Sequence, residues 1–145
     1  MDTRELARRL FEEGCNPAIY AIGERGGASD AFCLTRTGDE WQVYYTERGH
    51  DSPPMFATAS EEEACAYFLA HMRSIRHDHC VGFFRAREGA VALLGRLEAL
   101  GLAPWADQIP YGGPGDPRFR VFVSGTAVFA ARAELGAIPA RDEDA

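Results

Sequence analysis

Lysine is absent from this sequence: all 15 basic residues are arginine, set against 22 acidic residues. The formal net charge of -7 argues against general binding to nucleic acid or to an anionic membrane, because both need a basic protein surface. We therefore predict no nucleic-acid partner and expect a basic protein partner instead. Basic residues that are all arginine, with abundant alanine and glycine, are typical of a GC-rich bacterial gene.

Long apolar runs are also missing. No stretch approaches the roughly 18 residues that a membrane-spanning helix needs, and the polar start, residues 1–6, does not resemble a signal peptide. The four cysteines form no CxxC pair and stand apart at Cys15, Cys33, Cys65 and Cys80. We predict a cytoplasmic protein with reduced thiols and without a membrane partner.

Recognisable catalytic motifs are lacking as well. No serine lies in a G-x-S-x-G turn, and Ser60 is explained as a helix cap. The glycine run at 112–115 contains Pro114 and precedes a strand, so it predicts a tight turn and not a phosphate loop. We predict no catalytic residue and no cofactor. A cysteine–histidine pair brought together from distant segments stays open as an unlocated enzyme site.

The densest cluster of potential metal ligands is His71 with His77, Asp78, His79 and Cys80. Histidine and cysteine are zinc donors. However, His77 and His79 point to opposite sides of an extended chain, and no second ligand pair follows. We predict no metal site and interpret these histidines as residues that favour the negative end of a helix.

Hydrophobic periodicity predicts an α+β fold in which a small antiparallel sheet, a hairpin with further strands, is covered by helices. A chain of 145 residues fits a single domain, which we place at residues 1–140, followed by a polar C-terminal tail at 141–145. Residues 104–117 are expected to form a long loop. Expected helices span about 3–13, 60–76, 86–100 and 126–135; expected strands span 31–36, 40–47, 55–59 and 118–123, while 81–85 fits a strand or an irregular connection.

The first three predicted helices each have an apolar stripe at helical spacing. The Ser60–Glu63 segment has the pattern of a capping box, in which Ser60 and Glu63 bond each other's backbone amides. The predicted core residues of the first three helices are Leu6, Leu10 and Phe11; then Ala64, Cys65, Phe68, Leu69, Met72 and Ile75; then Ala90, Leu93, Leu94, Leu97 and Leu100.

Candidate binding residues follow from the faces of the predicted strands. On strand 40–47, Trp41, Val43 and Tyr45 are expected to face the core, because Gln42 and Thr46 on the other face are poor core residues. Tyr44 would then be an exposed aromatic anchor, as would a second tyrosine at 111 in the long loop.

Acidic residues gather around the hairpin end and the start of the second helix. They indicate either a solvated helix cap or a surface that attracts a basic protein. Arg118 and Arg120 alternate with phenylalanines, a pattern that can follow single-stranded nucleic acid but more often faces an internal or partner carboxylate. The candidate partner-binding residues are Tyr44, Glu47, Asp51, Glu61, Glu62, Tyr111, Arg118 and Arg120.

Two blocks of sequence resemble small bacterial immunity proteins. The first block, which lies within residues 31–69, is Trp41-Gln42-Val43-Tyr44-Tyr45-Thr46-Glu47-Arg48-Gly49 with Phe56 and Ser60-Glu61-Glu62-Glu63-Ala64-Cys65. The weaker block consists of residues 102–105 and 109–123. Such immunity proteins are encoded beside secreted polymorphic toxins, including toxins that act on NAD. The resemblance implies cytoplasmic inhibition of a cognate toxin by occlusion of its active site, and it transfers no binding residue to this chain.

An acidic inhibitor suits a toxin with a positively charged cleft for NAD or nucleic acid. The alternative is a small regulatory or ligand-binding domain. Its pocket is expected between the sheet and the C-terminal loop, around Trp105 and Tyr111.

Overall fold

The computed structural model describes residues 1–142, which contain helices and two mixed sheets, so the predicted α+β class is confirmed. Contacts within the chain divide it into two compact units, the first spanning Met1–Arg76 and the second beginning at His77. Each unit has its own sheet and core. The single domain at residues 1–140 stays a prediction, and the two units are described separately.

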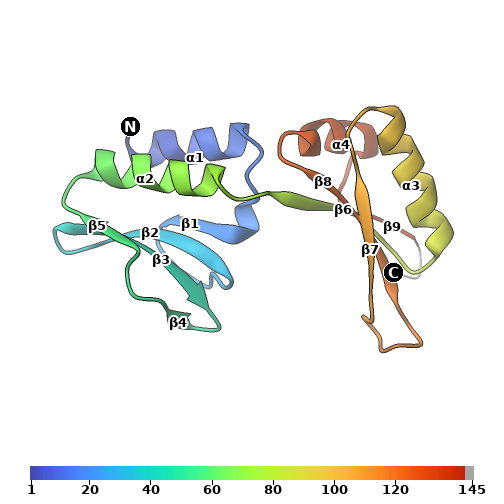
Figure 1. The fold of residues 1–145 in the computed structure, drawn as a ribbon, viewed down its shortest axis with the longest axis horizontal. Helices are drawn as coiled ribbons and strands as arrows, with labels where there is room; N and C mark the ends of the chain where they lie inside the picture. Colours follow the sequence, from blue (N-terminus) through green and yellow to red (C-terminus); the bar gives the residue numbers. More distant parts are fainter. Residues whose placement is uncertain (143–145) are drawn as a thin grey trace. The chain divides into compact units, whose positions relative to one another are not determined.

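In the first unit, two helices pack on one face of a small sheet (Figure 1). The β2–β3 hairpin is antiparallel, with Leu34 opposite Val43, whereas β1 pairs with β2 in parallel. Strand β3 also pairs with β4 near one end and with β5 near the other. The elements are α1 (Thr3–Glu12), a 3-10 turn (Pro17–Ile19), β1 (Tyr20–Gly23), β2 (Ala31–Thr37), β3 (Glu40–Glu47), β4 (His50–Asp51), β5 (Phe56–Thr58) and α2 (Glu61–Arg73).

Helix α2 begins at the predicted cap. The Ser60 hydroxyl accepts the amide N–H of Glu63 at 3.1 Å, which satisfies one free donor of the first turn. The return bond of a capping box is replaced: the Glu63 carboxylate accepts the Thr58 hydroxyl at 2.8 Å, and Thr58 accepts the Ser60 amide at 3.1 Å. Thr58, which belongs to strand β5, therefore links the start of α2 to the sheet.

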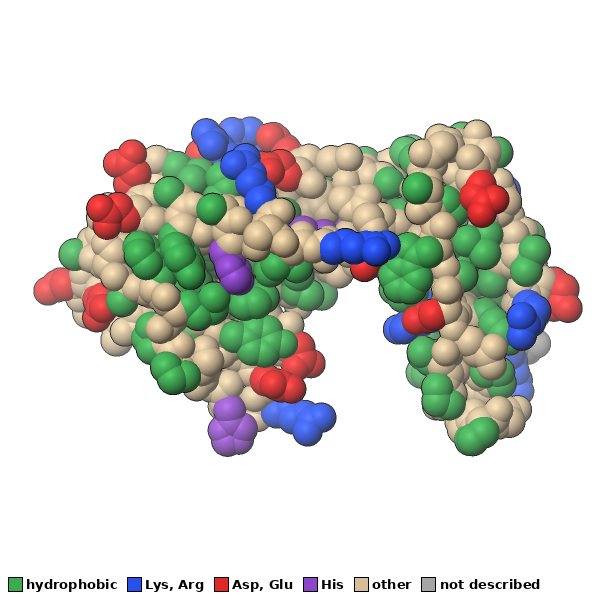
Figure 2. Space-filling model, in the orientation of Figure 1, with side chains coloured by type: hydrophobic (Ala, Val, Ile, Leu, Met, Phe, Trp, Pro, Cys, Tyr) green, Lys and Arg blue, Asp and Glu red, His purple; other side chains and the backbone are tan. Residues whose placement is uncertain are grey.

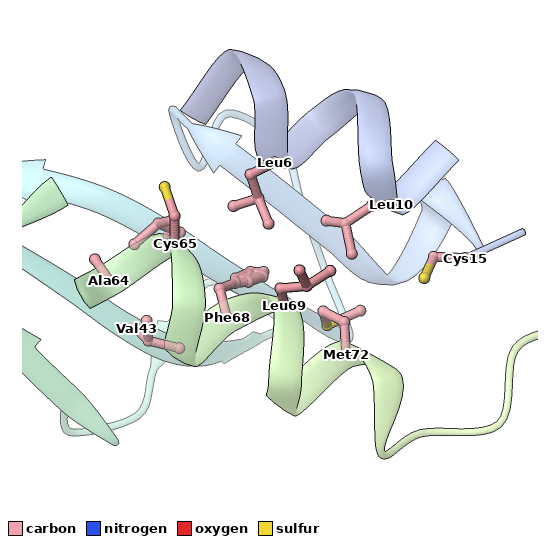
Figure 3. Packing of buried hydrophobic residues seen from close by; sticks show 10 residues of the cluster. Leu6, Leu10, Cys15, Val43, Ala64, Cys65, Phe68, Leu69 and Met72 are labelled. Atoms are coloured by element: carbon pink, nitrogen blue, oxygen red, sulfur yellow. The ribbon is translucent and has the colours of Figure 1, made fainter. Parts of the chain in front are cut away.

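The core of the first unit lies between the two helices and the β2–β3 ladder, where apolar side chains of α1 and α2 point toward each other and toward the sheet (Figure 3). Phe11 is an exception to the predicted core, since it is 56% exposed. Leu6 and Leu10 lie one turn apart and are fully buried, but Phe11 lies about 100° further round the helix. The buried residues are Leu6, Leu10, Cys15, Leu34, Val43, Ala64, Cys65, Phe68, Leu69 and Met72.

The second unit packs two helices on one face of a four-stranded sheet in the order β7-β8-β6-β9 (Figure 1). Its core contains Val81, Leu93, Leu97, Val121 and Val123. The β7–β8 and β6–β8 pairs are antiparallel, and the short β6–β9 pair is parallel. The elements are β6 (Asp78–Phe84), α3 (Arg87–Ala99), β7 (Trp105–Ile109), β8 (Arg118–Ser124), α4 (Ala127–Leu135) and β9 (Ala140–Arg141).

Two predictions for this unit are wrong. The expected loop at residues 104–117 contains strand β7, whose five residues pair with β8, including Asp107 opposite Arg120. The strand is short and a connection rich in glycine and proline separates it from β8, while Pro104 and Pro110 on either side suggested a loop. Leu100 is 49% exposed because it caps the end of α3 and does not belong to the buried stripe.

Part of the predicted polar tail is structural. Arg141 belongs to β9, and the Asp142 carboxylate accepts the backbone N–H groups of Arg85 at 3.1 Å and Ala86 at 2.9 Å. Ala86 is the N-cap residue of α3 and offers no side-chain cap, so Asp142 supplies one from a distant segment. These backbone hydrogen bonds hold the pKa of Asp142 below its usual range. Residues 143–145 of the predicted tail lie outside the described residues.

The buried ring of Phe68 gives a direct test of the first core. Phe68 is fully buried, and we expect Phe68→Ala to lower the free energy of unfolding of the first unit by about 3–5 kcal/mol through lost burial and a cavity. Phe11→Ala removes the same ring from an exposed site and should change it by less than about 0.5 kcal/mol. Urea unfolding followed by circular dichroism measures both; equal losses would contradict the assigned core.

Removal of the Asp142 carboxylate tests the distant helix cap. Because folding lowers the pKa of Asp142, its stabilisation is present above the unfolded-state value of about 3.9 and is lost as the pH falls through the folded value. Asp142→Ala should therefore cost the second unit about 1 kcal/mol at pH 7, and the difference from the unaltered protein should shrink in acid.

Glu98→Ala is the matched control, since it removes an exposed carboxylate from the other end of α3. Urea unfolding at several pH values provides the measurement. A cost of Asp142→Ala that is the same in acid as at neutral pH would show that the charge does not cap the helix.

Candidate functional site

A shallow hollow of about 430 Å³ lies at the end of the β3–β4 hairpin in the first unit. The hairpin turns tightly through Arg48 and Gly49, which both have positive φ angles of 51° and 81°, as a two-residue turn of this type requires. Figure 2 shows acidic, basic and histidine side chains together at this hairpin end. The hollow is lined by Tyr45, Glu47, Arg48, His50, Asp51 and Ser52.

Hydrogen bonds fix the walls of the hollow. Tyr45 and Ser52 are joined twice: the Tyr45 amide donates to the Ser52 hydroxyl at 2.9 Å, and the Ser52 amide donates to the Tyr45 carbonyl at 2.7 Å. Arg25 forms an ion pair with Asp51 at 3.0 Å and also donates to the Thr46 hydroxyl at 3.3 Å. The loop before β2 therefore supports the hairpin from its other side.

Tyr45 lies in an acidic environment. Desolvation raises the pKa of its phenol, and the carboxylates of Asp30 and Glu47 raise it further because they repel a phenolate. Glu47 forms no ion pair with any residue in the range 1–142, whereas Asp51 is already neutralised by Arg25. The Glu47 carboxylate is thus the group in the hollow that can pair with a cation of another molecule.

A row of aromatic rings extends from the hollow across the first unit. Tyr45 lies 4.9 Å from the ring centre of Phe32, which lies 4.5 Å from His71. The imidazole of His71 is parallel to Tyr67 at 6.2 Å, and Tyr67 stacks on Phe56 at 4.3 Å. Within the described chain the buried Nε2 atom of His71 has no hydrogen-bond partner. No local sequence pattern indicates this row, because its members come from four separate elements.

These rings are only partly buried. Figure 2 shows hydrophobic side chains gathered on this face of the first unit, around one histidine. Because the acidic hairpin end adjoins the row at Tyr45, the face combines an aromatic area with negative charge at its border. Such a composition suits a protein partner with exposed arginine or lysine side chains.

The predicted exposure of Tyr44 is wrong. Tyr44 is only 8% exposed, and its neighbours on the same strand face, Thr46 and Cys33, are fully buried. The Thr35 hydroxyl donates to the Tyr44 hydroxyl at 3.4 Å. The supposed solvent face is therefore a second buried layer, and threonine is accepted there because Arg25 bonds the hydroxyl of Thr46.

Of the predicted acidic residues, Glu47 and Asp51 are brought together and both line the hollow. Glu61 and Glu62 belong to the first turn of α2 and do not line it. The Glu61 carboxylate accepts the Thr3 amide at 3.0 Å and so connects the two helices, while Glu62 is exposed. The solvated-cap interpretation fits Glu62 better than a role in this hollow.

In the second unit, the predicted arginines already have partners within the chain. Arg118 is 7% exposed and bonds Asp116 at 2.8 Å, with its guanidinium 4.9 Å from the ring centre of Tyr111. Arg120 makes a two-pronged ion pair with Asp107, at 2.8 and 2.5 Å. Of the predicted residues in this unit, Tyr111 is the exposed one, at 64%.

The alternative pocket around Trp105 and Tyr111 is not where the apolar hollow of this unit lies. Trp105 stacks on Phe122 at 4.3 Å and donates its indole N–H to Asp78 at 3.1 Å. The hollow, of about 280 Å³, lies between α3 and β7 and is lined by neither predicted residue.

The possible chemistry of the chain is limited by where its reactive groups lie. In the described part of the chain, no group of three or more histidine, cysteine, aspartate or glutamate side chains could hold a metal ion. The cysteines form no disulfide among these residues, and desolvation raises the pKa of the buried Cys65 thiol to about 11. A thiol with a raised pKa is a poor nucleophile at neutral pH.

Comparison of the chain with models of protein families, with curated proteins and with solved structures finds no match. None of the helices in residues 1–142 has both the length and the apolar character that crossing a membrane requires. The geometry and charge of the chain are therefore the evidence from which a function is inferred.

The electrostatics of the hollow can be tested through Tyr45. Glu47→Gln removes one of the carboxylates that raise the pKa of the Tyr45 phenol, so this pKa should fall toward its ordinary value. Glu40→Gln is the matched control, because Glu40 lies five residues before Tyr45 on the same strand, roughly 17 Å away and beyond the Debye length of about 10 Å. Titration of ring-labelled tyrosine by NMR measures the Tyr45 pKa in both variants. A Tyr45 pKa that Glu47→Gln leaves unchanged would contradict the placement of Glu47 beside Tyr45.

Proposed function

We propose that this chain is a non-catalytic binding protein, an immunity protein that acts in the bacterial cytoplasm and neutralises a cognate toxin by occluding its active site. The observation that carries the proposal is the hairpin hollow of the first unit, with an aromatic wall at Tyr45 and an unneutralised carboxylate at Glu47. The resemblance of residues 31–69 to immunity proteins adds the class of partner.

The distribution of charge supports the first unit as the binding unit. It holds 13 of the 22 acidic residues but only 8 of the 15 basic residues, and so carries -5 of the formal net charge of -7. An acidic surface accelerates the encounter with a positively charged cleft and disfavours acidic partners. A toxin that binds NAD or nucleic acid presents such a cleft, because its substrate carries phosphates.

Binding through the hollow requires a cation from the partner. We expect an arginine or lysine side chain of the toxin to lie between Glu47 and the Tyr45 ring, where it gains both an ion pair and a cation–π contact. Aromatic residues are enriched at the centre of a protein interface, and polar residues form its rim.

The experiment uses the toxin domain encoded by the neighbouring open reading frame. Co-expression of this chain should restore growth of cells that produce the toxin, and the purified proteins should form a complex that no longer turns over substrate. The affinity should fall as salt is added, because long-range attraction is screened. If the neighbouring frame encodes no toxin and the chain protects no cell, the immunity role is wrong.

A charge reversal in the hollow tests the site separately from the role. Glu47→Arg places a cation against the expected cation of the toxin and should weaken the complex at least about tenfold. Glu40→Arg makes the same change in charge at the other end of β3 and should leave affinity nearly unchanged at physiological salt. Calorimetry measures both. Equal affinities for the two variants would show that the toxin binds elsewhere than at the hairpin end. Such a result would not contradict the immunity role.

A further inference from the structure

Strand β7 forms one edge of the second sheet. Among residues 1–142 it pairs with β8 alone, so its outer side offers backbone N–H and C=O groups to another strand. Pro104 and Pro110 flank the strand and confine this edge to the five residues Trp105–Ile109. An edge of this length can accept one short extended segment.

The apolar hollow of the second unit lies beside this edge. It measures about 280 Å³, and one wall is a face of α3 in which Ala90, Val91 and Leu94 follow Arg87 at helical spacing. Val91 is 59% exposed, so its apolar side chain is left uncovered at the hollow. The hollow is lined by Arg87, Ala90, Val91, Leu94, Ala106, Asp107, Gln108 and Phe119.

The hollow has the position that an added strand would fill. A fifth strand would lie about 4.8 Å beyond β7, and every second side chain would point to the face covered by α3. Ala106 and Gln108 pair with Val121 and Phe119, which pack in the core on that face, so β7 itself places only short or polar side chains there. The space above the edge is therefore left for a side chain from outside.

The positive charge of Arg87 beside the hollow favours a bound segment with an acidic side chain. Arg87 lies with its guanidinium 5.0 Å from the ring centre of Phe119, and among residues 1–142 it forms no ion pair. By contrast, Arg118 and Arg120 in the same unit are neutralised by Asp116 and Asp107. Arg87 is exposed at the hollow and available to a carboxylate.

We propose that this edge and hollow, which we call the β7 groove (Arg87, Val91, Leu94 and Trp105–Ile109), bind an extended protein segment that adds to β7 as a fifth strand. The segment carries an apolar side chain in the hollow and an aspartate or glutamate two residues away, opposite Arg87. Two residues of a strand span about 6.8 Å, close to the rise of about 6 Å from Arg87 to Val91 along the helix. This site goes beyond the toxin-binding surface proposed for the first unit and does not depend on it.

The test uses short peptides and the full chain. Acetylated and amidated pentapeptides, Thr-Val-Thr-Glu-Thr and its reversed order Thr-Glu-Thr-Val-Thr, are titrated into isotope-labelled protein and followed by NMR. One of the two should shift the amide signals of Trp105–Ile109 and of the exposed face of α3, and should slow hydrogen exchange of β7 edge amides. Replacement of the peptide glutamate by lysine should weaken binding roughly five- to tenfold.

A charge reversal at Arg87 tests whether this residue pairs with the charged side chain of the peptide. Arg87→Glu should invert the preference, so that the lysine peptide binds more tightly than the glutamate peptide. Arg132→Glu, the same change at an exposed position on α4, should leave the preference of the unaltered protein intact. Both positions are exposed, so both variants should fold.

Three outcomes of the peptide experiments would overturn the proposal. They are the absence of any shift at β7 with either peptide at millimolar concentration, shifts confined to residues outside the β7 groove, and a preference that Arg87→Glu does not change. A second copy of the chain is the other possible occupant of the edge. Analytical ultracentrifugation of the chain without peptide tests for such a dimer. A dimer that Val91→Asp disperses would assign the edge to a second copy and would also overturn it.

Discussion

The first unit depends on the register of the β2–β3 ladder. Placing Leu34 opposite Val43 sends Phe32, Val43 and Tyr45 to the face that α1 and α2 cover, and turns Cys33 and Tyr44 to the other face. A slip of one residue would exchange the two faces and remove the apolar layer from beneath Phe68. The same register carries Tyr45 beyond the part of the sheet that the helices bury, so the core and the candidate binding hollow are set by one pairing.

The charges on the strands are neutralised to different extents in the two units. In the second unit, Arg118 and Arg120 are held by neighbouring carboxylates and aromatic rings, which leaves little charge on that sheet face for a partner. In the first unit, Arg25 neutralises Asp51 but Glu47 stays open beside Tyr45. This difference, and not net charge alone, directs the binding proposal to the hairpin end.

Local patterns in the sequence predicted much of the fold. The Ser60 cap, the buried stripe from Ala64 to Met72 and the hairpin of strands 31–36 and 40–47 are all confirmed, because each depends on residues close together in the chain. The failures share a cause. Strand β7, the buried Tyr44 and the cap that Asp142 supplies to α3 all depend on partners outside the element itself, which the pattern within one element does not reveal.

For the candidate site, the sequence located the acidic hairpin end but not the aromatic row or the β7 groove, since both are assembled from separate elements. The most direct test of the central claim is amide hydrogen exchange of this chain with and without the toxin domain encoded beside it. Binding at the hollow predicts slowed exchange across residues 45–52. Complex formation with exchange at these residues unchanged would contradict it.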